Sequence, residues 1–194
     1  MEISAKIKYD KLKEFVKKMS EQYSVKVGLL ANKGGADEVS DDLDYAGLGA
    51  VQEFGCDIKI TEKMAAYLAI TAKELGLPKL EKQGDGYVHI PARSFLLMPL
   101  TRKNAILKKL KKKFDTKYIE DITYYLGKKG DLMTLAVLLA ASAVEVVQEA
   151  FDTGGFGQWE PDSPYTIAMK GSANPLLDTG ELRRKITYEI EQNG

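Results

Sequence analysis

A single apolar run past the middle of the chain constrains the fold more than any other feature of the sequence. From Asp131 to Phe151 the apolar residues cover most of the circumference of a helix, and Glu145 and Glu149 form its polar strip. A helix that is apolar nearly all round has to be packed on several sides. Its most apolar part, Leu132 to Val144, is about 13 residues long and too short to span a bilayer. We therefore expect a buried core helix and no membrane segment.

The rest of the sequence predicts short helices and strands around this core helix. The chain has 194 residues, 44% hydrophobic and 29% charged, which is typical of one globular domain. Apolar periodicity and helix caps predict strands at 24–30, 57–60, 87–90 and 186–190, and helices at 10–19 (capped by Asp10), 45–54, 62–75 (capped by Thr61), 104–114, 118–126 and 164–170 (capped by Ser163). The strands 57–60 and 87–90 could pair as a hairpin with a helix inserted between them. We expect an α+β fold over residues 1–194, a single domain with a helical excursion around 101–151. Its sheet should contain about four strands, antiparallel or mixed, packed against several helices.

Two glycine-containing stretches between these elements are predicted to be loops. Residues 31–44 are acidic, and residues 151–175 are rich in Gly, Pro, Asp and Ser and carry the only tryptophan, Trp159. Gly154, Gly155 and Gly157 give the second stretch several unrestrained backbone positions, which favours a loop that adapts to a partner. We expect both loops to become ordered on neighbouring molecules, and Trp159 to be exposed in the free subunit.

The sequence offers few groups for catalysis or metal binding. It has one cysteine, Cys56, and one histidine, His89, so a disulfide within the chain and a metal site of several His and Cys ligands are excluded. It has no phosphate-binding glycine loop and no zinc-protease motif. We expect no enzyme activity, no catalytic residue, no metal and no cofactor. A hydrolase that uses His89 with an Asp or Glu is a third interpretation of the chain.

The chain is neutral overall, with 28 basic and 28 acidic residues, but its charges are segregated. Residues 102–130 carry ten basic and three acidic residues, a net charge of +7, whereas residues 131–194 carry four and ten, a net charge of −6. This pattern fits a solvated basic helix, a contact between basic and acidic regions of neighbouring subunits in a ring, or nucleic acid on the lysines of 102–113. No aromatic stripe interleaves these lysines, so specific nucleic-acid binding is not expected.

Three stretches of the sequence, in this order and spacing, resemble a family of phage proteins. They are Tyr45-Ala46 with Val51-Gln52-Glu53-Phe54-Gly55, then Ile90-Pro91-Ala92-Arg93-Ser94-Phe95-Leu96, then Trp159-Glu160-Pro161 through Ser163-Pro164-Tyr165-Thr166 and Asp178-Thr179-Gly180 to Leu182-Arg183 and Ile186. They are similar to the virion-morphogenesis or tail-completion proteins of long-tailed bacteriophages and Mu-like prophages. The Lys- and Tyr-rich segment 110–126 has no counterpart in this resemblance.

The resemblance implies a minor structural protein at the head–tail junction or the tail end of the virion, present in the bacterial host cytoplasm during assembly. Its implied function is tail completion or head–tail joining. It would act through self-association, expected as a ring, and through contacts with tail-tube, tail-terminator or head–tail connector proteins. The alternative is a nucleic-acid-binding accessory protein that uses the basic helix 102–113.

Two interpretations of the resembling residues stay open. In the first they form subunit contacts, because Trp and Arg are favoured interface anchors. The candidate assembly interface then comprises Arg93, Phe95, Trp159, Tyr165, Arg183, Lys108, Lys109 and Lys112. In the second they hold the fold: the Arg93 guanidinium reaches a carboxylate bidentately, and Phe95 and Leu96 anchor its turn in the core.

Overall fold

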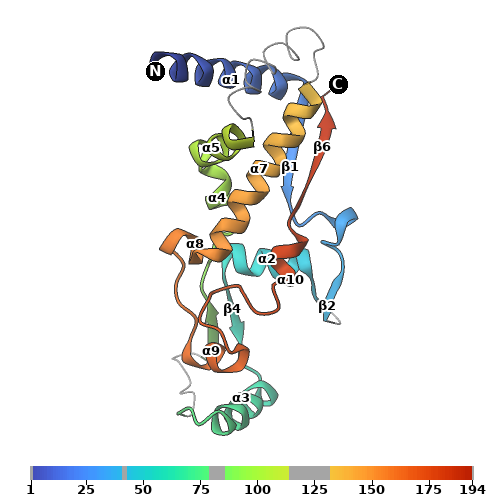
Figure 1. The fold of residues 1–194 in the computed structure, drawn as a ribbon. Coiled ribbons are helices and arrows are strands. Elements are labelled where there is room, and N and C mark those ends of the chain that lie inside the picture. The colour runs from blue at the N-terminus through green and yellow to red at the C-terminus, as the bar shows by residue number, and fades with distance from the viewer. Residues whose placement is uncertain (1, 41–42, 79–85, 114–131, 194) are drawn as a thin grey trace.

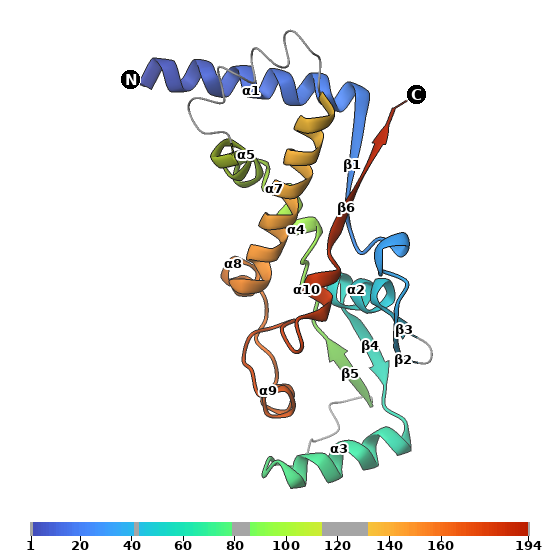
Figure 2. The same ribbon diagram turned by 45° about the vertical axis from the view of Figure 1, so that its right-hand side comes forward.

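The computed structural model of the chain describes residues 2–40, 43–78, 86–113 and 132–193. These residues form a mixed α+β single domain, with α1 across one end of the molecule and α3 at the opposite end (Figures 1 and 2). In chain order the elements are α1 (Glu2–Gln22), β1 (Tyr23–Gly28), the 3-10 helix η1 (Ala31–Lys33), β2 (Glu38–Ser40), β3 (Leu43–Asp44), α2 (Tyr45–Phe54), β4 (Cys56–Lys59), α3 (Glu62–Glu74), β5 (Tyr87–Ile90), α4 (Leu97–Thr101), α5 (Lys103–Lys113), α7 (Leu132–Asp152), α8 (Gly154–Gly157), α9 (Pro164–Lys170), α10 (Glu181–Lys185) and β6 (Thr187–Gln192). The predicted α+β class is confirmed, and the helix predicted at 118–126 lies outside the described residues.

Helix ends follow the local signals of the sequence. The helices α2 and α9 cover the predicted ranges 45–54 and 164–170. Asp44, Thr61 and Ser163 each accept a hydrogen bond from the backbone N–H three residues further on, at 2.6, 3.2 and 3.1 Å. Such caps satisfy one of the N–H groups that a helix leaves without an internal partner. The predicted caps Thr61 and Ser163 are therefore confirmed, whereas the cap predicted at Asp10 is wrong, because α1 begins at Glu2 and Asp10 lies inside it.

The predicted four-stranded sheet is wrong, because the strands of the described residues form three separate antiparallel pairs. β1 pairs with β6, β2 with β3, and β4 with β5. The β4–β5 pair is the predicted hairpin with a helix, α3, inserted between its strands. Alternation of apolar and polar residues marks a half-buried strand but does not identify its partner. Here β1 and β6 lie along α7, whereas β4 and β5 lead away from it toward α3 (Figure 2).

The helix α7 runs through the centre of the molecule, as its apolar circumference predicts. It contacts α1, α4, α5, β1 and β6, and ten of its 21 residues are buried. Among the described residues it is also the helix whose length and composition would allow it to cross a membrane. The helix α7 is thus longer than the most apolar run of the sequence. It packs as a core helix between the elements that surround it.

The stretches expected to be long loops carry short elements of their own. Residues 31–44 include η1 and the β2–β3 pair, and residues 151–175 include α8 and α9. The four residues of α8 have positive φ values between 58° and 76°, so this turn is left-handed. Left-handed backbone is strained for L-residues other than glycine, and three of the four residues are glycine. The fourth, Phe156, adopts φ 58° and ψ 36°.

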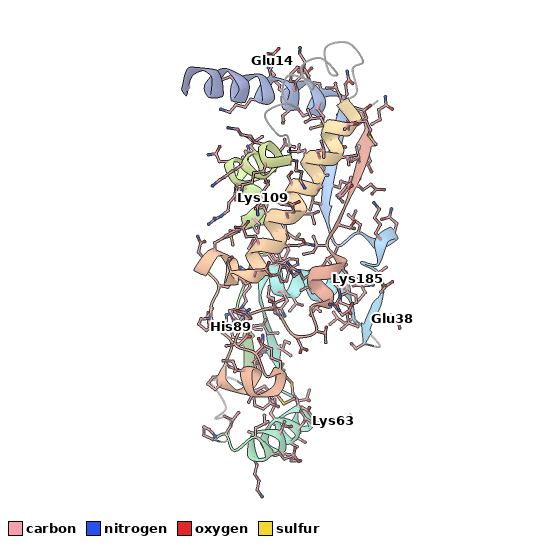
Figure 3. The ribbon with its side chains drawn as sticks, in the orientation of Figure 1. Glu14, Glu38, Lys63, His89, Lys109 and Lys185 are labelled. Atoms are coloured by element: carbon pink, nitrogen blue, oxygen red, sulfur yellow. The ribbon has the colours of Figure 1, made fainter. Side chains whose placement is uncertain are left out.

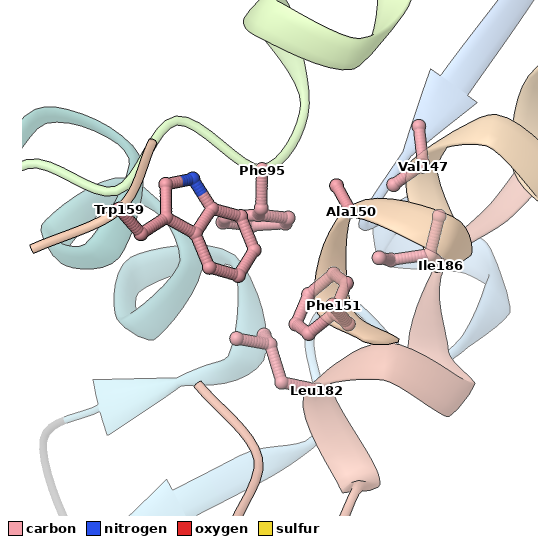
Figure 4. Close-up of a cluster of buried hydrophobic side chains, with 7 residues drawn as sticks. All are labelled: Phe95, Val147, Ala150, Phe151, Trp159, Leu182 and Ile186. Carbon is pink, nitrogen blue, oxygen red and sulfur yellow. The ribbon is translucent and has the colours of Figure 1, made fainter. Parts of the chain in front are cut away.

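This left-handed turn sends Trp159 into the core, so the expectation of an exposed tryptophan is wrong. Trp159 is 9% exposed, and its ring meets that of Phe151 edge to face with the centroids 5.7 Å apart (Figure 4). Its Nε1 donates a hydrogen bond to the carbonyl of Ser94 at 3.2 Å. A Cβ on Gly155 would lie 2.3 Å from the indole ring. The glycines therefore build a tight turn against the tryptophan and not an adaptable loop.

We expect Gly155→Ala to lower the free energy of unfolding by about 3 kcal/mol or more, since it adds left-handed strain and a clash with a packed ring. Gly157→Ala is the matched control. Gly157 has a similar φ of 76°, but a Cβ there would meet nothing within 4 Å. It should therefore lose only the strain, about 1–2 kcal/mol. Urea unfolding followed by Trp159 fluorescence measures both, and equal losses would contradict this packing.

Candidate functional site

The three stretches that carry the resemblance meet at one place, where β5, α2, α4 and the segment after α8 come together. The backbone N–H of Arg93 donates to the carbonyl of Gln52 at 2.7 Å, which joins the second stretch to the first. The indole of Trp159 donates to Ser94, which joins the third stretch to the second. We call the polar side chains at this meeting point the polar junction: Glu53, Arg93, Ser94, Asp162 and Lys170.

Glu53 holds one half of the polar junction. Its side chain comes from the last turn of α2, and the residue is only 7% exposed. Its carboxylate accepts hydrogen bonds from Ser94 Oγ and from the N–H groups of Phe95, Leu96 and Leu97, at 2.6, 2.8, 2.9 and 3.0 Å. Leu97 is the first residue of α4, Leu96 is its N-cap residue, and Phe95 precedes it; Leu96 makes no side-chain cap hydrogen bond of its own. A negative charge at a helix N-terminus is stabilising, so Glu53 caps α4 from another element.

Arg93 holds the other half of the polar junction. Its Nε donates to the carbonyl of Glu160 at 2.9 Å and its Nη2 to the carbonyl of Pro161 at 3.2 Å. The same Nη2 lies 3.0 Å from Asp162 Oδ1, and Lys170 Nζ lies 2.5 Å from Asp162 Oδ2. The Arg93 and Asp162 side chains are 7% and 5% exposed. The arginine thus reaches a carboxylate, as the fold-holding interpretation expects. The expected bidentate contact is wrong, because one carboxylate oxygen is bound and the other hydrogen bonds of the guanidinium go to backbone carbonyls.

The structure separates the predicted interface residues into three groups. Arg93, Phe95 and Trp159 are buried together at or beside the polar junction, so their side chains do not face a neighbouring molecule. Their prediction as surface contacts is wrong, because packing inside the subunit uses them. Tyr165 on α9 and Arg183 on α10 are half-buried. Arg183 forms an ion pair with Asp152 at 2.9 Å.

The third group is the basic face of α5, which the structure splits in two. Lys109, labelled in Figure 3, forms an ion pair with Glu149 of α7 at 2.7 Å, and Lys113 forms one with Glu145 of the same helix. The hydrogen bond to Glu149 raises the pKa of Lys109 above its ordinary value. Lys108, Lys111 and Lys112 are exposed. A contact between basic and acidic regions of neighbouring subunits is one of three interpretations of the charge pattern. In the structure these regions meet, in part, inside one subunit.

Sequence reasoning missed Glu53, Asp162 and Lys170, because a buried charged residue gives no local signal of its burial. It also left His89 without a named partner. His89 Nδ1 lies 2.7 Å from Asp57 Oδ1 across the β4–β5 pair, and both side chains are about two-thirds exposed. Within the described ranges no group of three or more His, Cys, Asp or Glu residues is placed to hold a metal ion.

Breaking the polar junction should be far more costly than breaking a surface ion pair. We expect Arg93→Met to lower the free energy of unfolding by about 3–5 kcal/mol, since it leaves buried carbonyls and part of a buried carboxylate without a donor. The matched control is Arg184→Met, because Arg184 pairs with Glu181 where both side chains are 57% and 44% exposed. It should lose at most about 1 kcal/mol. Chemical unfolding of the three proteins decides, and losses of similar size would contradict the burial of the junction.

Comparison with protein-family models, with curated proteins and with solved structures finds no match to this chain. The family resemblance therefore rests on the three stretches themselves. Along the sequence more than thirty residues separate each stretch from the next. In the structure the three stretches share the contacts of the polar junction.

Proposed function

We propose that this chain is a non-enzymatic phage structural protein that acts in tail completion or head–tail joining. It would act through self-association, as a ring, and through contacts with tail-tube, tail-terminator or connector proteins. It would be located at the head–tail junction or tail end of the virion, and in the host cytoplasm during assembly. The observation that carries this proposal is that the three resembling stretches pack on one another, so that they act as one structural unit of the chain.

Two exposed apolar side chains beside the polar junction give this unit a surface for assembly. Phe54 follows Glu53 at the end of α2 and is 74% exposed. Leu97 is 63% exposed, and its N–H is bonded to the Glu53 carboxylate at 3.0 Å. The two residues therefore flank the same capped turn. Exposed aromatic groups on a rigid frame are typical of interaction sites, so Phe54, and not the buried Trp159, is the aromatic contact of this proposal.

Deletion of the gene from its phage or prophage tests the proposed function. We expect filled heads and tails that fail to join, or tails with an abnormal end, in electron micrographs of the lysate. Antibody-gold particles on wild-type virions should mark the head–tail junction or the tail end. Normal infectious particles from the deletion strain would contradict the proposal.

Complementation of the deletion strain tests the assembly surface. We expect Phe54→Ser to leave the free energy of unfolding of the free subunit within about 0.5 kcal/mol, since the ring is exposed. It should nevertheless lower the yield of infectious particles. Met133→Ser is the matched control, because Met133 is an exposed apolar side chain on α7, away from the junction. Equal particle yields for the two variants would exclude Phe54 as a contact.

The exposed lysines of α5 favour a second candidate function, nucleic-acid binding. Lys108, Lys111 and Lys112 lie on one side of the helix, and the structure gives none of them an ion pair within the described part of the chain. Three lysines can neutralise phosphates, but only through salt-sensitive contacts that do not read sequence.

We expect the chain to bind DNA only weakly at physiological salt, with a dissociation constant of about 10⁻⁴–10⁻⁶ M in gel-shift assays. Replacing Lys108, Lys111 and Lys112 by Gln should impair self-association more than any DNA-dependent property. Submicromolar binding that this triple variant abolishes would instead favour the nucleic-acid function. Lys17→Gln, at an exposed lysine on α1, controls for the loss of a single positive charge elsewhere on the chain, and each of the three lysines is replaced singly for comparison with it.

A further inference from the structure

The β4–β5 pair and α3 form an arm that leaves much of its apolar surface uncovered. Figures 1 and 2 show α3 at the end of this arm, at the opposite end of the molecule from α1. Within the described residues the only buried residue of α3 is Ala72. Large exposed apolar side chains gather on or next to the arm: Phe54, Ile58, Tyr67, Ile70 and Tyr87.

The uncovered side of α3 carries an ordered stripe of four residues. Lys63, Tyr67, Ile70 and Glu74 are spaced by four, three and four positions. At 3.6 residues per turn they fall within an arc of about 60°, on the side of the helix away from Ala72. Tyr67 is 58% exposed and Ile70 is 60% exposed, and Lys63 and Glu74 are exposed as well (Figure 3 shows Lys63). We call these four residues the α3 stripe.

The α3 stripe is complementary to itself when it is reversed. In an antiparallel pair of α3 helices, with Tyr67 of each copy opposite Ile70 of the other, Lys63 of each copy lies opposite Glu74 of the other. The apolar residues then meet at the centre and opposite charges meet at both ends. In a parallel pair, lysine would face lysine and glutamate would face glutamate, which is unfavourable. Charge therefore selects the antiparallel arrangement.

We propose that the α3 stripe is a contact between two copies of this chain, in which two α3 helices pack antiparallel about a twofold axis. Such a contact is isologous and closes on two copies. This inference rests on the proposed function, because it gives the proposed self-association one specific contact. The contacts of a ring would be made by other surfaces of the chain. A 13-residue helix is about 20 Å long, so one helix face buries less than a standard interface, and the dimer is reversible.

Sedimentation equilibrium of the full chain tests the pairing by exchanging its charges. Over about 1–500 μM the wild-type chain should show a reversible monomer–dimer equilibrium. Lys63→Glu places glutamate opposite glutamate at both ends, and Glu74→Lys places lysine opposite lysine. Each should raise the dissociation constant about tenfold, whereas the double variant, Lys63→Glu with Glu74→Lys, should return it to within about threefold of wild type.

Two controls separate pairing from folding and from general charge effects. Lys17→Glu makes the same charge change on α1 and should leave the dissociation constant unchanged. Ile70→Lys should abolish the dimer while the free energy of unfolding stays close to wild type, because the side chain is exposed. A wild-type chain that is monomeric throughout, single variants that dimerise normally, or a double variant without rescue would each overturn the proposal.

Complementation of the deletion strain distinguishes failure of this inference from failure of the proposed function. A chain that stays monomeric in solution but completes particles contradicts the α3 contact alone. A chain that dimerises as described, from a gene that particle joining does not need, contradicts the proposed function alone.

Discussion

A carboxylate withdrawn from water, as that of Glu53 is, is tolerated in a fold only when its hydrogen bonds are satisfied. Four donors from the turn after β5 meet this requirement, and they fix that turn against the end of α2. The position of this turn then fixes the direction of its side chains: Phe95 enters the core and Arg93 reaches the segment 160–162. The arrangement of α2, β5, α4 and the chain after α8 thus depends on one buried charge.

The tryptophan completes this arrangement from the other side. Its indole packs on Phe151 at the end of α7 and donates to the Ser94 carbonyl, so it ties the core helix to the same turn. Between Phe151 and Trp159 the chain passes through the left-handed turn of α8. Phe156 adopts an unfavourable left-handed backbone conformation in this turn. Its ring stacks on the Arg102 guanidinium, whose Cζ lies 3.7 Å from the ring centroid. Strain at one residue is therefore offset by packing on both sides of the turn.

Sequence reasoning succeeded where the deciding interactions are local and failed where they are distant. The caps at Thr61 and Ser163 act within three residues, so these helix starts could be predicted. The pairing of β4 with β5 could be predicted as well, whereas the pairing of β1 with β6, from opposite ends of the chain, could not. The glycines around Trp159 were consistent with an adaptable loop and with a tight turn, and only the indole contact distinguishes the two. For the candidate site, the second interpretation of the Arg93 turn described its role. Its partner Asp162, 69 residues away in the chain, could not be identified from spacing. Periodicity predicted the helix at 62–75, but it did not show that Tyr67 and Ile70 are exposed on it.

The distribution of charge links the core to the surfaces left for assembly. Ion pairs of Lys109 and Lys113 with α7 neutralise part of the segregated charge within the subunit, so long-range attraction between oppositely charged regions of neighbours is reduced. Contacts between copies then have to be selected by short-range complementarity of charge and shape. The α3 stripe supplies such complementarity. Because α3 lies at the opposite end of the molecule from α1, copies joined through α3 would hold their α1 ends and their exposed α5 lysines away from the shared axis (Figure 1). The surfaces around Phe54 and the lysines of α5 would stay free for other partners, so pairing through α3 and assembly into a larger structure need not compete.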